Sequence, residues 1–329
     1  MKFFRAILRV LQPISPNAAA WLAERLFFTA PRRVLSAPAR AFLATGERFT
    51  LRVEGWRVAG WQWGDVRTAP IVYLSHGWAS RGARLAAFTP PLLAAGYAVV
   101  TYDAPGNGAS ARGMTSMPEY ARALMAVAAH VSNGRMPHAV IAHSMGCSGT
   151  ALALSWGLEV GRLAFLAPAA DPPSWVKPLV SALELRTDVV ELLRARSQRR
   201  LRVNWDDLHV CDIARRLPAR PPLLIVHDKH DETVAWNDGS AIAAAWPGST
   251  FISTERLGHR GVTQDDAVVR QVVEFVTGEP VKHTSRRDSD SQRLEYELFY
   301  RDERISSAFS RSSKPRSSGT LRSDATQYV

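Results

Sequence analysis

Short apolar runs alternate with longer amphipathic stretches through the middle of the chain. The apolar runs are rich in β-branched and aromatic residues, and they occupy residues 71–74, 98–102, 139–142, 163–166, 223–226 and 250–252. Between them, apolar side chains recur at helical spacing over residues 83–95, 118–131, 146–157 and 236–246. This alternation predicts β-α-β units. Because the runs are apolar on both faces, we expect a mainly parallel, doubly wound sheet with helices on both faces.

Two further runs precede this alternation, at residues 50–53 and 56–63, and they flank Glu54-Gly55. A Gly at this place favours a tight turn. We therefore predict an antiparallel pair of strands that extends one edge of the sheet.

Polar residues directly follow several of the predicted strands. In a parallel sheet the carboxyl ends of the strands meet at one edge, where ligands bind. The polar residues that follow the strands occupy residues 75–78, 103–110, 143–146, 227–231 and 258–260. The sequence therefore predicts a functional site at this edge of the sheet.

Ser144 stands at the junction of a predicted strand and a predicted helix. Ala142 and Gly146 flank it two residues away on either side, and small residues permit a sharp turn between closely packed neighbours. At the start of the helix, the amide of Met145 is placed to donate to a developing oxyanion. We therefore predict that Ser144 is a nucleophile rather than a helix N-cap.

A serine nucleophile needs a base and a group that orients the base. His259 follows the last predicted strand, and Asp231 follows the strand before it, so that the chain order is Ser, Asp, His. This is one of the orders in which catalytic triads occur. Asp228 is an alternative acid in the same loop as Asp231.

Together these motifs resemble the α/β-hydrolase superfamily over residues 17–277. The resemblance rests on His76-Gly77-Trp78, residues 103–110, the Ser144 turn, residues 227–231 and Gly258-His259. It implies the α/β-hydrolase fold, with Ser144 as nucleophile, Asp231 as acid, His259 as base, and an oxyanion hole formed by the backbone amides of Trp78 and Met145. The sequence departs from the family pattern at Ala142, where glycine is commoner, and at Asn107, where histidine is usual.

Other chemistries find less support in the sequence. Gly106 and Gly108 belong to neither a P-loop nor a complete dinucleotide-binding fingerprint. The histidines and aspartates of residues 227–231 crowd one short loop, and no distant His or Cys completes a metal site. Cys147 is expected to pack inside its helix. Four further histidines are expected to be structural or exposed, namely His76, His138, His143 and His209. We expect no metal and no cofactor.

The net charge of +11 is concentrated near the N-terminus, because residues 1–48 contribute +6 and the central body is nearly balanced. This distribution argues against a nucleic-acid partner. The two cysteines form no CxxC pair, which favours a reduced, cytoplasmic chain.

The first 16 residues are basic and apolar, but Arg5 and Arg9 interrupt the apolar run and Pro13 ends it, so we expect no signal peptide. Residues 17–28 then predict an amphipathic helix. We expect this helix to dock on the body. Peripheral contact with a membrane surface is the alternative, since no segment is long and apolar enough to span a bilayer.

The connection over residues 168–221 is too long for a plain link between strands, and it predicts a helical lid. Apolar side chains at helical spacing, from Trp175 to Leu183, are expected to roof the Ser144 pocket and to favour uncharged acyl chains of short to medium length. A crossover helix without influence on the substrate is the alternative. The arginines of residues 194–202 are expected to form a solvated helix face, with an anionic partner or an acidic substrate as the alternative.

These observations predict three segments: a basic helical segment at residues 1–48, a hydrolase domain with its lid at residues 49–278, and a disordered Ser/Arg-rich tail at residues 279–329. The predicted function is hydrolysis of small-molecule carboxylic esters through an acyl-serine intermediate. A thioesterase, an amidase or an acyltransferase would use the same triad. A non-catalytic binding protein on the same scaffold is a further alternative.

Overall fold

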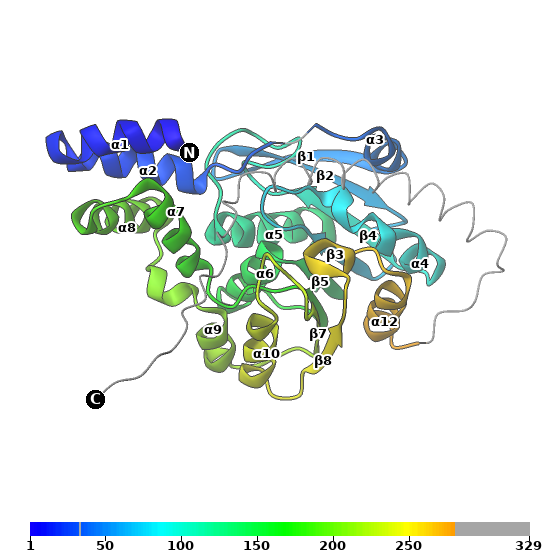
Figure 1. Cartoon of the computed structure of the whole chain (residues 1–329). Coiled ribbons are helices and arrows are strands. Elements are labelled where there is room, and N and C mark those ends of the chain that lie inside the picture. The colour runs from blue at the N-terminus through cyan, green and yellow to red at the C-terminus, as the bar shows by residue number, and fades with distance from the viewer. Residues whose placement is uncertain (33, 280–329) are drawn as a thin grey trace, which may run out of the picture.

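The computed structural model describes residues 1–32 and 34–279, and within them eight strands form one sheet in the order β1-β2-β4-β3-β5-β6-β7-β8 (Figure 1). The strands are β1 (Glu47–Val53), β2 (Trp56–Trp63), β3 (Ile71–Ser75), β4 (Ala98–Asp103), β5 (Ala139–His143), β6 (Arg162–Leu166), β7 (Leu223–Asp228) and β8 (Thr250–Thr254). β1 and β2 pair antiparallel, β2 pairs antiparallel with β4, and every later pairing is parallel. This order confirms the predicted mainly parallel sheet with an antiparallel edge.

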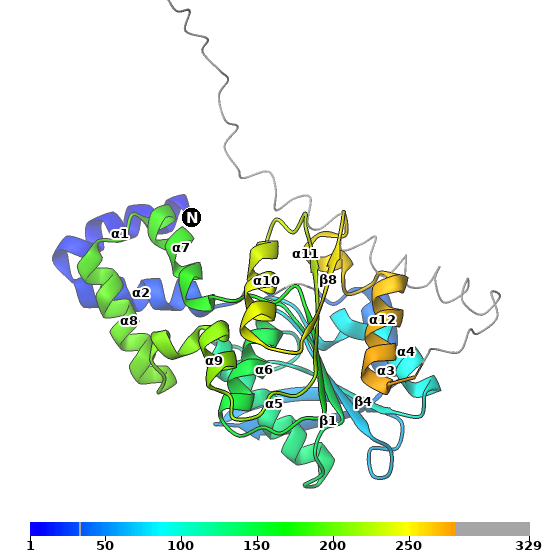
Figure 2. The same cartoon turned by 90° about the horizontal axis from the view of Figure 1, so that it is seen from below.

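Helices cover both faces of the sheet because its central strands are apolar on both sides. β3, β4, β5 and β7 are buried at every residue. One face carries α5 (Met117–Ser132), α6 (Met145–Ser155), α9 (Val210–Arg216) and α10 (Trp236–Ala245). The other face carries α3 (Ala37–Ala44), η1 (Gly82–Phe88), α4 (Thr89–Ala94) and α12 (Asp266–Thr277), as Figure 2 shows. The doubly wound architecture predicted from the sequence is confirmed.

The helix predicted over residues 83–95 is two shorter helices. η1 is a 3₁₀ helix, and α4 starts at Thr89 with Pro90 and Pro91 in its first turn. Proline lacks an N–H and is tolerated only where that group has no helical partner. The two prolines therefore end one helix and begin the next.

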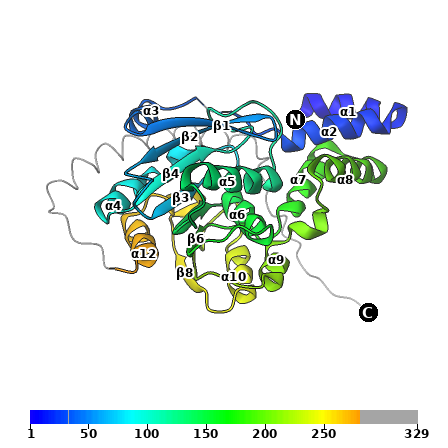
Figure 3. The same ribbon diagram turned by 180° about the vertical axis from the view of Figure 1, so that it is seen from behind.

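Four helices form a cap beside the carboxyl ends of the strands. Two come from the N-terminal segment, α1 (Lys2–Ile14) and α2 (Pro16–Phe28), and two come from the long connection between β6 and β7, α7 (Val176–Leu183) and α8 (Thr187–Leu201). α2 packs along α8, and α1 packs on α7 (Figures 1 and 3). The cap is therefore built from two distant parts of the chain.

α1 extends to Ile14 and includes Pro13, although the apolar pattern predicts that the run ends at Pro13. The helix ends at Ser15, whose side chain accepts a hydrogen bond from Ala18 N and caps α2. Among the described residues, none of the helices has the length and apolar character that crossing a bilayer requires. The predicted tail lies outside the described residues apart from Glu279.

Candidate active site

Ser144 lies on a sharp turn between β5 and α6. Its backbone has φ 53° and ψ −121°, a conformation that costs energy for a residue with a Cβ atom. Gly146 allows the turn, because a Cβ atom there would lie 2.4 Å from the Ser75 carbonyl oxygen. Gly77 also allows close packing, since a Cβ atom added there would lie 3.0 Å from Ser144 Cβ. The turn therefore presents Ser144 beside the loop that follows β3, as the sequence predicts.

The Gly77 carbonyl is held from two sides. It lies 2.7 Å from His76 Nδ1 and accepts a hydrogen bond of 2.8 Å from the Tyr120 hydroxyl. His76 Nε2 accepts from Ala104 N at 2.9 Å, so that Nδ1 carries the proton. Burial lowers the pKa of His76 and keeps the ring neutral.

The fixed Gly77 carbonyl sets the direction of the Trp78 amide. The peptide bond is trans, so the Trp78 N–H points away from the fixed Gly77 carbonyl. Met145 N belongs to the first turn of α6, where amides have no acceptor within the helix. The two amides predicted to form the oxyanion hole are thus on the two loops that meet at Ser144.

Asp231 and His259 are in direct contact. His259 Nδ1 lies 2.7 Å from Asp231 Oδ2, and the Asp231 carboxylate is fully buried. The other carboxylate oxygen accepts hydrogen bonds from Thr233 N and Val234 N. Burial opposes ionisation of Asp231, but hydrogen bonds from His227 and His259 outweigh it and hold its pKa well below the ordinary range. Asp231 is therefore a carboxylate at neutral pH and accepts the Nδ1 proton of His259.

Two further histidines support this pair, and the sequence reasoning did not assign them these roles. His227 Nε2 lies 3.3 Å from Asp231 Oδ2 and 3.1 Å from Val234 O, so its proton is on Nε2. His143 Nε2 lies 2.8 Å from the His259 carbonyl oxygen, with the two rings 4.7 Å apart. Burial lowers the pKa of His143 far enough to keep it neutral. The available signal was position, because His143 and His227 lie at the carboxyl ends of β5 and β7, the strands that lead to Ser144 and Asp231.

The structure places the alternative acid, Asp228, away from this pair. Its Oδ1 accepts from His230 N, and its Oδ2 accepts from the Thr254 hydroxyl and from Leu257 N. Burial alone would raise the pKa of Asp228, but these donors lower it. Asp228 therefore joins the loop after β7 to the loop after β8.

His143 links Ser144 to His259. It precedes Ser144 in the chain, and its ring packs on the His259 ring. Within the residues that the structure describes, Ser144 Oγ forms no hydrogen bond to the imidazole. Such contacts commonly tighten only when a substrate is bound. The structure thus brings Ser144, Asp231 and His259 to one edge of the sheet.

A pocket of about 230 Å³ begins at Trp78 and Met145. Its lining comes from α2, from the start of α5, and from the connection between β6 and β7: Phe27, Phe28, Ser116, Met117, Pro118, Pro172, Pro173, Trp175, Leu201, Trp205 and Leu208. Of the residues predicted to form the roof, Trp175 lines this pocket, but Val176, Leu179, Val180 and Leu183 do not. They are wrong predictions, because α7 uses this face to pack within the cap, where Leu183 is fully buried.

The prediction of a solvated arginine face is also wrong in part. Arg196 Nε and Arg200 Nε lie 3.3 and 3.0 Å from the Glu24 carboxylate, and Arg200 Nη1 lies 2.6 Å from Glu119. Glu24 is almost fully buried, and Arg200 also stacks on Phe28. These arginines face inward because α2 supplies a buried acid that the pattern of α8 alone does not reveal.

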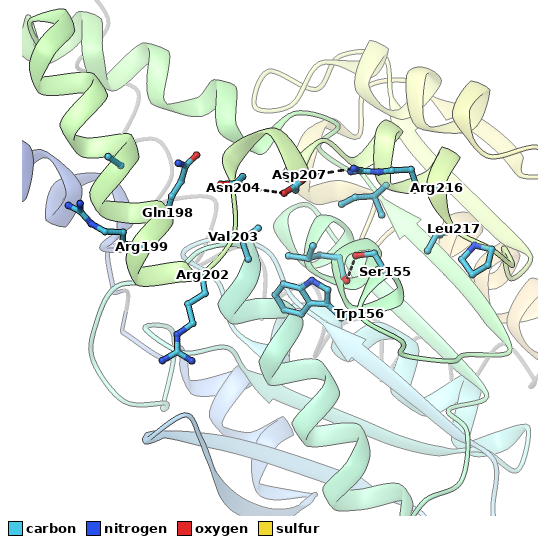
Figure 4. A pocket seen from close by; sticks show the side chains of 14 residues that line it. Ser155, Trp156, Gln198, Arg199, Arg202, Val203, Asn204, Asp207, Arg216 and Leu217 are labelled. Atoms are coloured by element: carbon cyan, nitrogen blue, oxygen red, sulfur yellow. Dashed lines mark hydrogen bonds and ion pairs between the residues drawn. The ribbon is translucent and has the colours of Figure 1, made fainter.

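A second hollow, of about 790 Å³, lies between α6, α8 and α9 (Figure 4). Arg216 is directed at Asp207, with their charged atoms 3.5 Å apart. Figure 4 shows Arg199 and Arg202 turned away from Asp207. Neither the Ser144 turn nor the Asp231–His259 pair lines this hollow, so it is separate from the candidate active site.

Residues 1–32 and 34–279 contain no group of three or more His, Cys, Asp or Glu side chains arranged to hold a metal ion. The loop over residues 227–231 uses its side chains otherwise: His227 and Asp231 contact each other, and Asp228 binds backbone amides.

Comparison with known proteins places the chain among hydrolases in fold. The family model described as serine aminopeptidase, S33 matches residues 67–218. No curated protein matches the sequence.

Many solved structures share the fold. A hydrolase from Pseudomonas aeruginosa PA01 is 19% identical with a TM-score of 0.56, over 70% of this chain and 98% of that one. The esterase Pf2001 from Pyrococcus furiosus is 18% identical with a TM-score of 0.55, over 76% and 99%. Est1E from Butyrivibrio proteoclasticus, with ferulic acid bound, is 16% identical with a TM-score of 0.53, over 70% and 96%.

Proposed function

Because this chain belongs to the α/β-hydrolase superfamily, we propose that it is a serine hydrolase that cleaves carboxylic esters through an acyl-serine intermediate. One observation carries the proposal. The buried Asp231 carboxylate holds His259 Nδ1 at 2.7 Å, at the same edge of the sheet as the strained turn that carries Ser144. A strained backbone that nearby glycines are needed to accommodate is typical of a functional site.

The first half of the reaction forms the acyl enzyme. Ser144 Oγ attacks the carbonyl carbon while His259 Nε2 takes its proton, and Asp231 stabilises the imidazolium through Nδ1. The oxyanion accepts hydrogen bonds from Trp78 N and Met145 N. The tetrahedral intermediate then collapses, the carbon–oxygen bond to the alcohol breaks, and the leaving alcohol takes the proton from His259.

Water completes the cycle. His259 takes a proton from a water molecule, whose oxygen attacks the acyl carbon, and the second tetrahedral intermediate forms in the same oxyanion hole. Its collapse returns the proton to Ser144 Oγ and releases the carboxylic acid. The same groups thus serve both steps without a cofactor.

The lining of the pocket supports an uncharged acyl group. All the residues that line it are apolar except Ser116, and it opens beside the two proposed oxyanion donors. A charged group buried there would lose its hydration without a compensating partner. An aminopeptidase-like activity on free amino termini would need an acid near the substrate ammonium, and the pocket lining contains none. Esters of short to medium apolar acids therefore fit best, in line with the esterase among the structural relatives.

The test is hydrolysis of p-nitrophenyl butyrate by Ser144→Ala and by a control, Ser155→Ala. Ser155 lies at the end of the same helix and lines the second hollow. We expect Ser144→Ala to lower kcat by about 10³-fold or more, and Ser155→Ala to leave it unchanged. Circular dichroism checks that both variants are folded. Turnover by Ser144→Ala close to that of the wild type would refute the proposed nucleophile, and loss of activity in Ser155→Ala would move the site to the second hollow.

A further inference from the structure

One face of α1 is apolar and exposed along its whole length. The side chains of Phe3, Ile7, Val10 and Ile14 are 71%, 37%, 63% and 74% exposed. With Ala6 and Pro13, which are also exposed, they fall within about 120° of the helix circumference at 100° per residue. No charged residue interrupts this arc. We call these six residues the outer face of α1.

The outer face is not the result of a helix that has failed to dock. The opposite side of α1 is buried at Leu8 and Gln12. Gln12 Nε2 donates to Glu184 O, and Gln12 Oε1 accepts from Arg186 N. Arg5 and Arg9 both pair with the Glu184 carboxylate. α1 is therefore held in one orientation by the link between α7 and α8, and its outer face lies on the side of the helix opposite to these contacts.

Exposed apolar side chains are concentrated here rather than scattered. Within the described part of the chain, eight large hydrophobic side chains are exposed, and six of them belong to the first 21 residues. The other two are Val34 and Met136. A contiguous exposed apolar patch on a soluble domain marks a surface that binds a partner.

The charge around the outer face selects the kind of partner. The chain has no acidic residue before Glu24, and Glu24 is buried against Arg196 and Arg200. Glu184, the acid that contacts α1, is paired with Arg5 and Arg9. Lys2 is exposed beside the outer face. The surroundings are thus basic, and they complement an anionic surface.

The size of the outer face argues against a second copy of the chain. A helix of 13 residues is about 20 Å long, and an arc of this width covers roughly 200 Å². A stable protein interface buries about 800 Å² on each partner. A narrow, protruding apolar stripe with basic flanks is instead typical of helices that lie in the surface of a membrane.

We propose that the outer face of α1 inserts into the surface of an anionic lipid bilayer. α1 continues through Ser15 into α2, whose last residues, Phe27 and Phe28, line the pocket beside Ser144. Because α1 packs alongside α2, attachment of α1 would hold the pocket beside the lipid, about one interhelical distance, roughly 10 Å, beyond α1. Membrane attachment specifies the substrates of the proposed ester hydrolysis, on which this inference rests. They are esters of apolar acids that are carried in the bilayer.

The test is sedimentation of the full chain with vesicles of phosphatidylcholine, alone or mixed with phosphatidylglycerol. We expect binding to the mixed vesicles that weakens with added salt. Phe3→Glu/Val10→Glu should reduce that binding by about tenfold or more. Met136→Glu is the matched control, because it places a glutamate at an exposed apolar position elsewhere, and it should bind as the wild type does.

Several results would overturn the proposal. These are wild-type protein that stays in solution with the mixed vesicles, equal binding to both kinds of vesicle, or full binding by Phe3→Glu/Val10→Glu. A dimer in sedimentation velocity that this double variant dissociates would assign the outer face to a second copy instead.

Enzyme assays separate this proposal from the proposed function. Phe3→Glu/Val10→Glu should hydrolyse soluble p-nitrophenyl butyrate as the wild type does, and should lose activity only on p-nitrophenyl decanoate carried in vesicles. Ser144→Ala should bind the vesicles normally and hydrolyse neither ester. Loss of soluble activity in the double variant, whose circular dichroism is checked, would show that the outer face serves the fold instead of a membrane.

Discussion

Replacing Glu24 by Gln should loosen the cap measurably. Glu24 is 5% exposed and contacts Arg196 and Arg200, whose side chains are 30% and 26% exposed. Glutamine has the same shape but no charge. The substitution therefore leaves two partly buried guanidinium groups without their common partner, and of its two carboxylate contacts Arg200 keeps that with Glu119.

The size of the effect follows from the burial of the cluster. At an effective dielectric constant of about 20, charges 3 Å apart attract by about 5 kcal/mol, much of which offsets the desolvation of the ions. Removing one partner of a fully buried pair costs about 3–5 kcal/mol. Exposed pairs are worth about 1 kcal/mol or less. Because the guanidinium groups retain contact with water, we expect Glu24→Gln to lower the free energy of unfolding by about 2 kcal/mol.

Thermal unfolding followed by circular dichroism measures this change. For a chain of this size, a loss of about 2 kcal/mol lowers Tm by about 4 °C. Glu255→Gln is the matched control, because Glu255 pairs with Lys229 at 2.9 Å on the surface, and it should leave Tm unchanged. Equal Tm values for the two variants would show that the Glu24 cluster does not hold α2 and α8 together.

Two further predictions concern the active site. Asp231→Asn should lower kcat/KM on p-nitrophenyl butyrate by about 10²- to 10⁴-fold, because an amide at this position favours the wrong imidazole tautomer, whereas Asp228→Asn should cost less than about tenfold; the reverse ranking would reassign the acid. The free energy of unfolding should fall as the pH is lowered from 7.5 to 5.5, because burial lowers the pKa of His143 and of His76, and the unfolded chain therefore binds more protons below about pH 6.5. In urea titrations, His143→Gln should reduce this pH slope by up to about 1.4 kcal/mol per pH unit, and an unchanged slope would contradict a neutral, buried His143. Asp231, whose pKa is lowered, adds no slope in this range, since its stabilising effect is lost only below about pH 4.

The sheet and the turn at Ser144 could be predicted because their signals are local. A strand that is buried on both faces can be recognised from a short apolar run alone. The turn at Ser144 can be recognised from the small residues on either side of it, which a sharp turn requires. The choice between Asp228 and Asp231 needed the structure. Asp228 ends β7 and Asp231 follows it three residues later, and only the path of the loop after β8 decides which carboxylate reaches the His259 ring.

The cap was predicted less well because its contacts join distant segments. The periodicity of α8 does not show that α2 supplies Glu24, so the pattern predicts that Arg196 and Arg200 face water. Phe27 and Phe28 likewise gave no signal as pocket residues, because their helix precedes the sheet. The division of the chain at residues 48 and 278 stays a prediction.

The origin of the cap in two separate segments has a consequence for how the chain acquires its structure. Arg5 meets Glu184 across 179 positions of sequence. At a synthesis rate of about 5–20 residues per second, α1 and α2 leave the ribosome roughly 10 to 40 s before their partner helices exist. During that interval α2 lacks the contacts with α8 that its native packing includes. α1 and α2 therefore reach these native contacts only after the residues of α7 and α8 have been made, although they precede them in the chain.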